Sequence, residues 1–143
     1  MAGLSLDQAS RIIDAALEKA RALNCDPLSV AVLDAGGHLV AFKRQDGSGI
    51  LRPEIAIGKA YGALGFGLGS RALKEKHPQF LNAVAAAAQG RMVPVPGGVL
   101  IRRFEAGEVV GAVGISGDTS DKDEAAAIAG IEAIGLNADV GIE

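Results

Sequence analysis

The chain has 143 residues, of which 49% are hydrophobic and 22% charged, a composition that fits neither a disordered tail nor a membrane span. Its net charge is −3 and its basic residues are scattered, so an electrostatic footprint for nucleic acid is not expected. Cys25 is the single cysteine, which excludes an internal disulfide and fits the reducing cytoplasm. The start of the chain does not resemble an export signal, and no apolar run approaches the roughly 20 residues of a spanning helix. We therefore expect one cytoplasmic domain over residues 1–143, with neither nucleic acid nor membrane as partner.

The first half of the chain predicts a helix, a hairpin and a second helix. Apolar residues at helical spacing predict a helix over residues 6–23, with Ser5 and Gln8 in the positions of a capping box. Residues 28–34 and 38–44 are two β-rich runs joined by an Ala-Gly-Gly turn, which is typical of a hairpin. Residues 50–68 return to helical spacing, with Pro53 in the first turn.

The second half repeats the hairpin between helices. Short helices are predicted over residues 70–76 and 78–89, a loop over 91–98, and a hairpin from residues 99–104 and 109–115. Ser120 and Asp123 suggest a capping box for a last helix over residues 121–134, and the tail after Leu136 is expected to be mobile unless a neighbouring subunit holds it. Two hairpins separated by helices predict an antiparallel sheet covered by helices, the α+β class.

The alanine-rich segment over residues 83–88 bears on assembly. A core poor in aromatic residues and rich in alanine and glycine leaves apolar faces that a monomer would expose. The sequence therefore predicts a homo-oligomer.

Charge is concentrated where the first hairpin meets the second helix, in a segment that holds Arg44, Asp46, Arg52, Glu54 and Lys59. Lys59 falls on a largely apolar helical face. A structural ion pair is the favoured interpretation of a charge in that place. The functional alternative is a clamp for an anion or carboxylate, because guanidinium groups bind carboxylates through two parallel hydrogen bonds.

Gly97 and Gly98 follow a stiff proline-containing stretch and enter the third strand. Consecutive glycines there can aim backbone N–H groups at a ligand, or can simply permit a tight turn. The sharpest hypothesis places Arg44, Arg52, Lys59 and the two glycine amides around one carboxylate pocket. In an enzyme, Lys59 or Glu54 would serve as acid or base.

Residues 67–72, Gly-Leu-Gly-Ser-Arg-Ala, match the loosest form of a dinucleotide fingerprint but follow a helix, whereas that motif requires a preceding strand. We therefore reject a nicotinamide site. The glycines of this stretch are instead expected to permit close packing on another element; they are Gly58, Gly62, Gly65, Gly67 and Gly69.

His38 in a hairpin turn and His77 at a helix end are the only histidines, so a site with several histidines cannot form within one chain. A solvated side chain is the ordinary interpretation of each, and a single axial ligand to a haem iron is the alternative. The acidic cluster of Asp118, Asp121, Asp123 and Glu124 is explained by capping of the last helix. Asp34 is interpreted as a turn residue.

Taken together, five motifs resemble the GlcG/HbpS family, which includes the C-terminal domain of PduO-type proteins and is often labelled haem-binding or haem-degrading. They are residues 32–40, 44–47, 55–60, 96–98 and 111–117, the last followed by Asp123 and Glu124. The resemblance spans nearly the whole chain and implies a profilin-like or PAS-like antiparallel sheet of four or five strands flanked by helices, with multimers up to octamers. Members often carry Ser near the position of Arg52 and Thr near that of Gly62, and this chain departs at both.

Three functions follow from the residues and the resemblance. The first is a small-molecule-binding protein for haem or another tetrapyrrole, and the second is a cofactor-free enzyme or sensor for a small organic acid. The third is an oligomeric accessory protein. The departures make the pocket more basic, which together with so few aromatic residues favours a small acidic metabolite over haem.

Overall fold

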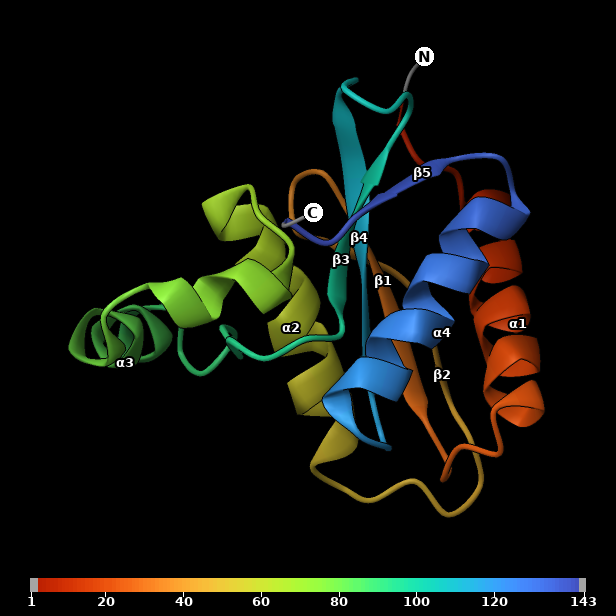
Figure 1. Ribbon diagram of the computed structural model, residues 1–143, viewed down its shortest axis with the longest axis horizontal. Helices are drawn as coiled ribbons and strands as arrows, with labels where there is room; N and C mark the ends of the chain where they lie inside the picture. Colours follow the sequence, from red (N-terminus) through yellow and green to blue (C-terminus); the bar gives the residue numbers. More distant parts are fainter. Residues whose placement is uncertain (1–2, 142–143) are drawn as a thin grey trace.

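The computed structural model describes residues 3–141 and contains a five-stranded antiparallel sheet with helices on both faces (Figure 1). The strand order is β2-β1-β4-β3-β5, and every neighbouring pair is antiparallel. The elements in chain order are α1 (Leu6–Ala22), β1 (Ser29–Asp34), β2 (Leu39–Arg44), α2 (Arg52–Phe66), the 3₁₀ helix η1 (Ser70–Glu75), α3 (Pro78–Ala87), β3 (Gly98–Arg102), β4 (Val109–Ser116), α4 (Ser120–Ala133) and β5 (Asn137–Asp139). This arrangement confirms the predicted α+β class.

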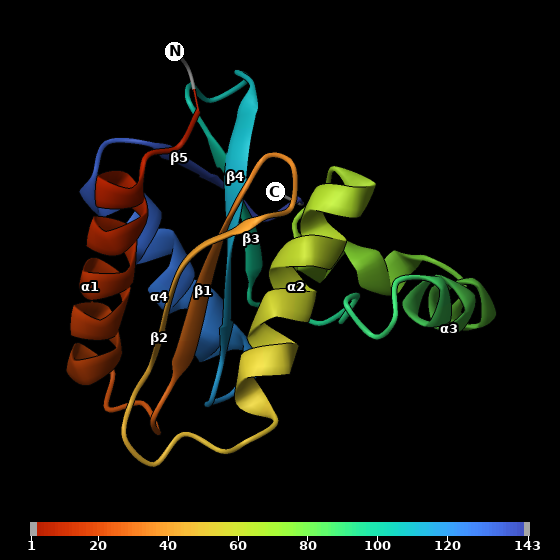
Figure 2. The same ribbon diagram turned by 180° about the vertical axis from the view of Figure 1, so that it is seen from behind.

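The two faces of the sheet bury different kinds of residue. Helices α1 and α4 lie side by side on one face and α2 covers the other (Figures 1 and 2). Large branched side chains such as Val113 and Ile115 of β4 face α1 and α4, whereas the alternate positions, Ala112 and Gly114, face α2. The period of two along a strand therefore separates a bulky face from a small-residue face.

Glycine on the small-residue face lets α2 lie very close to the sheet. A Cβ atom at Gly114 would stand 1.9 Å from the carbonyl oxygen of Ala56, and one at Gly98 would stand 2.2 Å from that of Lys59. Both distances are far inside van der Waals contact. Consequently α2 backbone and strand backbone touch, and side chains of α2 such as Lys59 are enclosed.

Helix α3 forms an arm that projects away from the sheet beyond α2 (Figure 1). The arm is attached through a small apolar cluster of Leu73, Leu81 and Met92, to which Phe66 at the end of α2 contributes. Phe80 on α3 is 52% exposed, and Ala83 and Ala87 are exposed as well. The arm thus carries apolar surface that this chain does not cover.

The structure tests the predicted helix starts and helix types. The capping box of Ser5 and Gln8 is confirmed. The one predicted for the last helix is wrong, because Thr119 is the N-cap and its hydroxyl accepts from the Lys122 N–H. Residues 70–75 form a 3₁₀ helix.

The tail after Leu136 is also a correction. It continues into β5, which pairs with β3, and Arg102 Nε donates to Asp139 Oδ2 at 2.7 Å. No second subunit is needed to hold residues 137–141, and residues 142–143 lie outside the described part of the chain.

Close packing is confirmed for three of the five helical-region glycines. A Cβ at Gly58, Gly62 or Gly69 would lie within 3.0 Å of another side chain or backbone, whereas one at Gly65 or Gly67 would meet nothing within 4 Å. Gly67 instead ends α2 with φ of 69°.

Within residues 3–141, no helix has the length and apolar character to cross a lipid bilayer.

Candidate functional site

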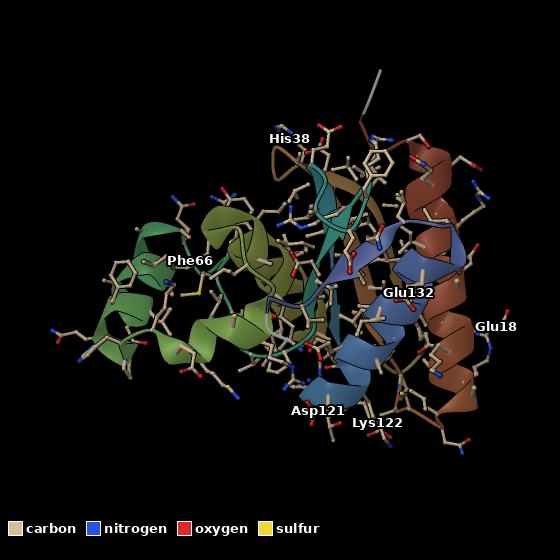
Figure 3. All side chains as sticks on the ribbon, turned by 45° about the horizontal axis from the view of Figure 1, so that its top comes forward. Glu18, His38, Phe66, Asp121, Lys122 and Glu132 are labelled. Carbon is tan, nitrogen blue, oxygen red and sulfur yellow. The ribbon has the colours of Figure 1, made fainter. Side chains whose placement is uncertain are left out.

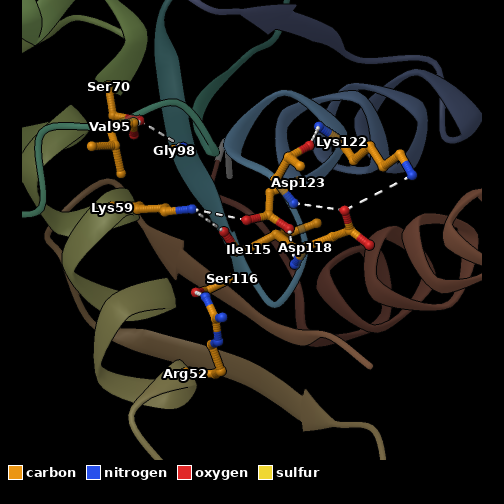
Figure 4. Close-up of polar contacts among 11 residues, drawn as sticks. Arg52, Lys59, Ser70, Val95, Gly98, Ile115, Ser116, Asp118, Lys122 and Asp123 are labelled. Atoms are coloured by element: carbon orange, nitrogen blue, oxygen red, sulfur yellow. Dashed lines mark hydrogen bonds and ion pairs between the residues drawn. The ribbon is translucent and has the colours of Figure 1, made fainter. Parts of the chain in front are cut away.

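Lys59, the central residue of the predicted carboxylate pocket, is enclosed between α2, β4 and α4. Its side chain is 2% exposed, and the Nζ atom donates to Asp123 Oδ2 at 3.1 Å and to the carbonyl oxygen of Ile115 at 2.8 Å (Figure 4). The Asp123 side chain is 1% exposed. The favoured interpretation from the sequence, a structural ion pair, is therefore confirmed.

Burial also sets the protonation tendencies of this pair. Loss of hydration lowers the pKa of the Lys59 ammonium and raises the pKa of the Asp123 carboxyl, while their mutual attraction opposes both shifts. The other Asp123 oxygen accepts from the backbone N–H of Asp118 at 3.0 Å. A carboxylate held on both oxygens fixes the start of α4 against α2.

Gly97 and Gly98 lie against Lys59, as the hypothesis of one pocket requires, but the Gly98 N–H and the Gly97 carbonyl already have partners. The Gly98 N–H donates to Ser70 Oγ at 2.8 Å, and the Gly97 carbonyl accepts from the Ile115 N–H at 3.0 Å. A Cβ at Gly97 would stand 2.8 Å from Lys59 Nζ. The glycines therefore admit the lysine side chain to the interior.

The arginines of the charged segment occupy two different hollows. Arg52 is half-buried, donates from Nη1 to Ser116 Oγ at 3.0 Å, and lines a hollow of 370 Å³ with Gly49 and Ile55 (Figure 4). Arg44 donates to the Ser48 carbonyl and lines another hollow, of 460 Å³, together with Asp46.

Glu54 is exposed in the first turn of α2. The structure thus brings Lys59 and the glycines together, and it places Arg44 and Asp46 apart from them.

His38 lies at the exposed tip of the turn between β1 and β2, where it contacts Asp34 (Figure 3). Its Nδ1 is 3.0 Å from Asp34 Oδ1, and its side chain is 79% exposed. The same oxygen accepts from the backbone N–H groups of Gly36 and His38. The absence of a side chain at Gly36 permits this contact, because a Cβ there would lie 2.8 Å from Cε1 of the imidazole.

Hydrogen bonding determines which imidazole nitrogen is available. The backbone N–H of His38, together with its imidazole, holds the pKa of the Asp34 carboxyl below its ordinary value, so Asp34 is ionised at neutral pH. An ionised carboxylate can only accept, so Nδ1 carries the proton. In neutral imidazole the lone pair then resides on Nε2, the arrangement that histidine ligands of metals adopt.

Two hollows lie at this turn, and they share two lining residues. The larger measures 380 Å³ and is lined by His38 and Asp34 together with the apolar residues Leu4, Val109 and Val110. A second, of 170 Å³, shares Ala35 and Gly36 with it and extends to Tyr61 of α2. Imidazole and apolar wall therefore occur together at this edge of the molecule.

His77 has a different environment. It is the N-cap of α3, and its Nδ1 accepts from the backbone N–H of Gln79 at 3.1 Å. Across the described residues 3–141, no three or more His, Cys, Asp or Glu side chains are grouped so that they could hold a metal ion. Each of the two histidines could therefore contribute only a single ligand to a metal ion.

Asp34 is the turn residue that the sequence predicts, since its Oδ1 accepts from the Gly36 and His38 N–H groups, but its contact with the His38 imidazole was missed at the level of sequence. The available signal was its spacing of four residues from His38 across an Ala-Gly-Gly turn, which brings the two side chains to the same side of the hairpin. The partner of Lys59 had no local signal, because Asp123 follows it by 64 residues.

Fold and site together define a small antiparallel α+β protein that presents a carboxylate-oriented histidine beside an apolar hollow. The family described as "Haem degrading protein HbpS-like" matches residues 4–132, and the chain belongs to it. A curated relative, described as an uncharacterized 15.0 kDa protein in the dhaT-dhaS intergenic region of Citrobacter freundii, is 29% identical over 125 residues, which is 86% of each chain.

Solved structures agree with this assignment. The PduOC:heme complex is similar with a TM-score of 0.84 and 26% identity, covering 95% of this chain and 98% of the other. A double mutant of Streptomyces reticuli HbpS gives a TM-score of 0.78 and 26% identity, over 94% of this chain and 89% of the other.

Proposed function

We propose that this protein binds haem or a related tetrapyrrole, with His38 as the iron ligand. The observation that carries the proposal is the Asp34–His38 pair, which leaves Nε2 of an exposed imidazole with a free lone pair beside an apolar hollow. The family description and the haem complex of a structural relative support the same ligand.

The residues at the hollow fit such a group. Its volume of 380 Å³ lies in the range of cofactor sites, and Leu4, Val109 and Val110 supply aliphatic contacts to a flat ring. Glu108 also lines the hollow and pairs with Arg103, whose Nε lies 3.3 Å from Glu108 Oε1, so the positive charge of Arg103 offsets the negative charge of this carboxylate. Haem bound there would supply an iron centre whose potential and reactivity depend on its axial ligand.

Titration with hemin, followed by the Soret absorption, tests the proposal. We expect saturable binding by the wild-type protein, and at least tenfold weaker binding with a changed spectrum for His38→Ala. His77→Ala is the matched control and should bind like the wild type, because that histidine caps a helix on the arm. Gly36→Ala should displace the imidazole from Asp34 and also weaken binding.

Two results would contradict the proposal. One is a wild-type spectrum and affinity in His38→Ala, and the other is the same spectrum in the double replacement of His38 and His77.

A second candidate function is binding of a small carboxylate at Arg52. It is supported by the half-buried guanidinium, which lines a hollow of 370 Å³ and contacts Ser116. Catalytic roles for Lys59 or Glu54 stay predictions, as does participation of Arg44, Asp46, Gly97 and Gly98. Calorimetric titration of Arg52→Gln with glycolate would test this candidate, and an affinity equal to that of the wild type would argue against it.

A further inference from the structure

A slot between α2 and the arm is lined by neither His38 nor Lys59. This slot, called here the α2–α3 slot, measures 210 Å³ and is lined by Tyr61, Gly65, Phe66, Val84, Ala88 and Met92, among others. Phe66 and the arm that forms one wall are visible in Figure 3. The lining consists mainly of two aromatic rings, small aliphatic side chains and a thioether. Since an apolar cavity of about 150 Å³ accepts benzene, this slot has room for a body of roughly six to nine heavy atoms.

Arg91 connects the two walls of the slot. Its guanidinium carbon lies 4.4 Å from the centroid of the Tyr61 ring on α2, and its Nε donates to the carbonyl oxygen of Ala88 at 3.1 Å. Its side chain is exposed, and no carboxylate within residues 3–141 forms an ion pair with it. A guanidinium anchored in this way is ready to bind a carboxylate through two hydrogen bonds.

Gly65 gives an independent indication that the slot admits a ligand. Glycine within a helix is less stable than alanine, so a glycine there usually reflects close packing. That reason applies to Gly62, where a Cβ would stand 3.0 Å from Met92 Cγ, but not to Gly65, where it would meet nothing within 4 Å. A side chain at Gly65 would instead enter open space, and Gly65 lines both the slot and the 170 Å³ hollow.

We propose that the α2–α3 slot binds a small carboxylic acid with an apolar or aromatic body, whose carboxylate pairs with Arg91. The aromatic rings and Met92 enclose the body, the guanidinium at the mouth holds the charge, and Gly65 keeps the entrance free. The slot shares no lining residue with the 380 Å³ hollow at His38, and the proposal does not depend on haem binding.

Benzoate is a suitable probe, and the methyl group of Met92 is a suitable reporter. Met92 is one of two methionines in the chain and lines the slot, so ¹³C-methyl labelling of methionine yields a signal from the slot. We expect benzoate to shift the Met92 signal saturably. Benzamide, its neutral analogue, should bind about tenfold more weakly, since a charge-assisted pair is lost.

Two matched pairs of variants test the two halves of the site. Arg91→Gln should reduce benzoate affinity to that of benzamide, whereas Arg11→Gln, which removes the same charge from α1 at a pair with Asp7, should not. Gly65→Leu should fill the slot and prevent binding of both ligands. Gly65→Ala, the matched change with a small side chain, should bind more like the wild type. Melting curves of both Gly65 variants verify that they are folded.

Three outcomes would overturn the proposal: an unresponsive Met92 methyl, benzoate binding by Gly65→Leu that equals the wild type, or an affinity unaffected by Arg91→Gln. An unresponsive Met92 methyl together with a wild-type dimer that Gly65→Leu dissociates would show that a second copy of the chain occupies the slot. His38→Ala should leave benzoate binding intact, so this proposal and the one on haem fail independently.

Discussion

In the folded protein the Lys59 ammonium contacts the Asp123 carboxylate and the Ile115 carbonyl in place of water. Removal of its charge is therefore expected to lower the stability of the protein strongly. Lys59→Met keeps most of the stem but leaves Asp123 buried without its partner. We expect a loss of about 3–5 kcal/mol in the free energy of unfolding, measured by urea denaturation at neutral pH.

The double variant Lys59→Met with Asp123→Asn is the control for that experiment. It retains an oxygen for the Asp118 N–H and removes the unpaired charge, so most of the stability should return. Wild-type stability in Lys59→Met alone would instead mean that the lysine is free to serve a ligand.

The Lys59→Met variant should also acquire a distinct pH dependence. Burial raises the pKa of Asp123, and loss of the lysine charge removes the main opposing influence. The folded state then binds more protons than the unfolded state at pH values above the ordinary carboxyl pKa of 3.8, so stability falls as pH rises through that window. Urea midpoints measured between pH 4 and pH 7 should show that the stability deficit of Lys59→Met relative to wild type grows as the pH rises. A deficit that stays constant over this range would contradict this account.

At the scale of elements, hydrophobic periodicity in the sequence predicted the helices and strands whose apolar residues pack in the core. The α1 helix and both hairpins were predicted because their apolar residues recur at the spacing that the core requires. Strand β5 was missed because Asn137-Ala138-Asp139 is short and polar. It is held by its ladder to β3 and by the Arg102–Asp139 pair, neither of which has a local signal.

Val140, directly after β5, packs against Gly69, the residue before η1, which makes Gly69 a sensitive position. A Cβ there would stand 2.1 Å from the carbonyl carbon of Val140. We expect Gly69→Ala to displace the segment after β5, to lower stability by roughly 1–3 kcal/mol and to increase amide exchange in β5. Gly65→Ala, where a Cβ meets nothing within 4 Å, is the control and should not be destabilised. Unchanged exchange in β5 would show that the backbone adjusts at no cost.

At the scale of the whole molecule, the sequence identified charged and glycine-rich segments but not their arrangement. Lys59 and Gly97 were expected in one ligand pocket. They are in contact, but the Lys59 ammonium is buried and paired with Asp123. Arg44 lies in another hollow, because β2 is an edge strand and both β1 and β4 lie between it and β3. Such separations depend on strand order, which spacing along the chain does not reveal.

Assembly into an oligomer stays a prediction, now with a specific surface. The exposed face of α3, which includes Phe80, Ala83 and Ala87, is apolar and projects from the body. Light scattering should give a mass above that of one chain, and Ala87→Glu should reduce it without lowering the melting temperature. Ala133→Glu, at an exposed alanine of α4, is the matched control and should leave the mass unchanged. A wild-type monomer at micromolar concentration would refute the prediction.

The place of β1 between β2 and β4 has a consequence for synthesis on the ribosome. The β1–β2 hairpin can close early, but β1 pairs along its other edge with Val109–Ser116, which emerge only when most of the chain has been made. Until then the branched side chains Val30 and Val32, fully covered in the finished protein, have neither β4 nor α4 beside them. Folding must therefore be largely post-translational and slow for a protein of this size, and nascent chains that stall before β4 should depend on chaperones to remain unaggregated.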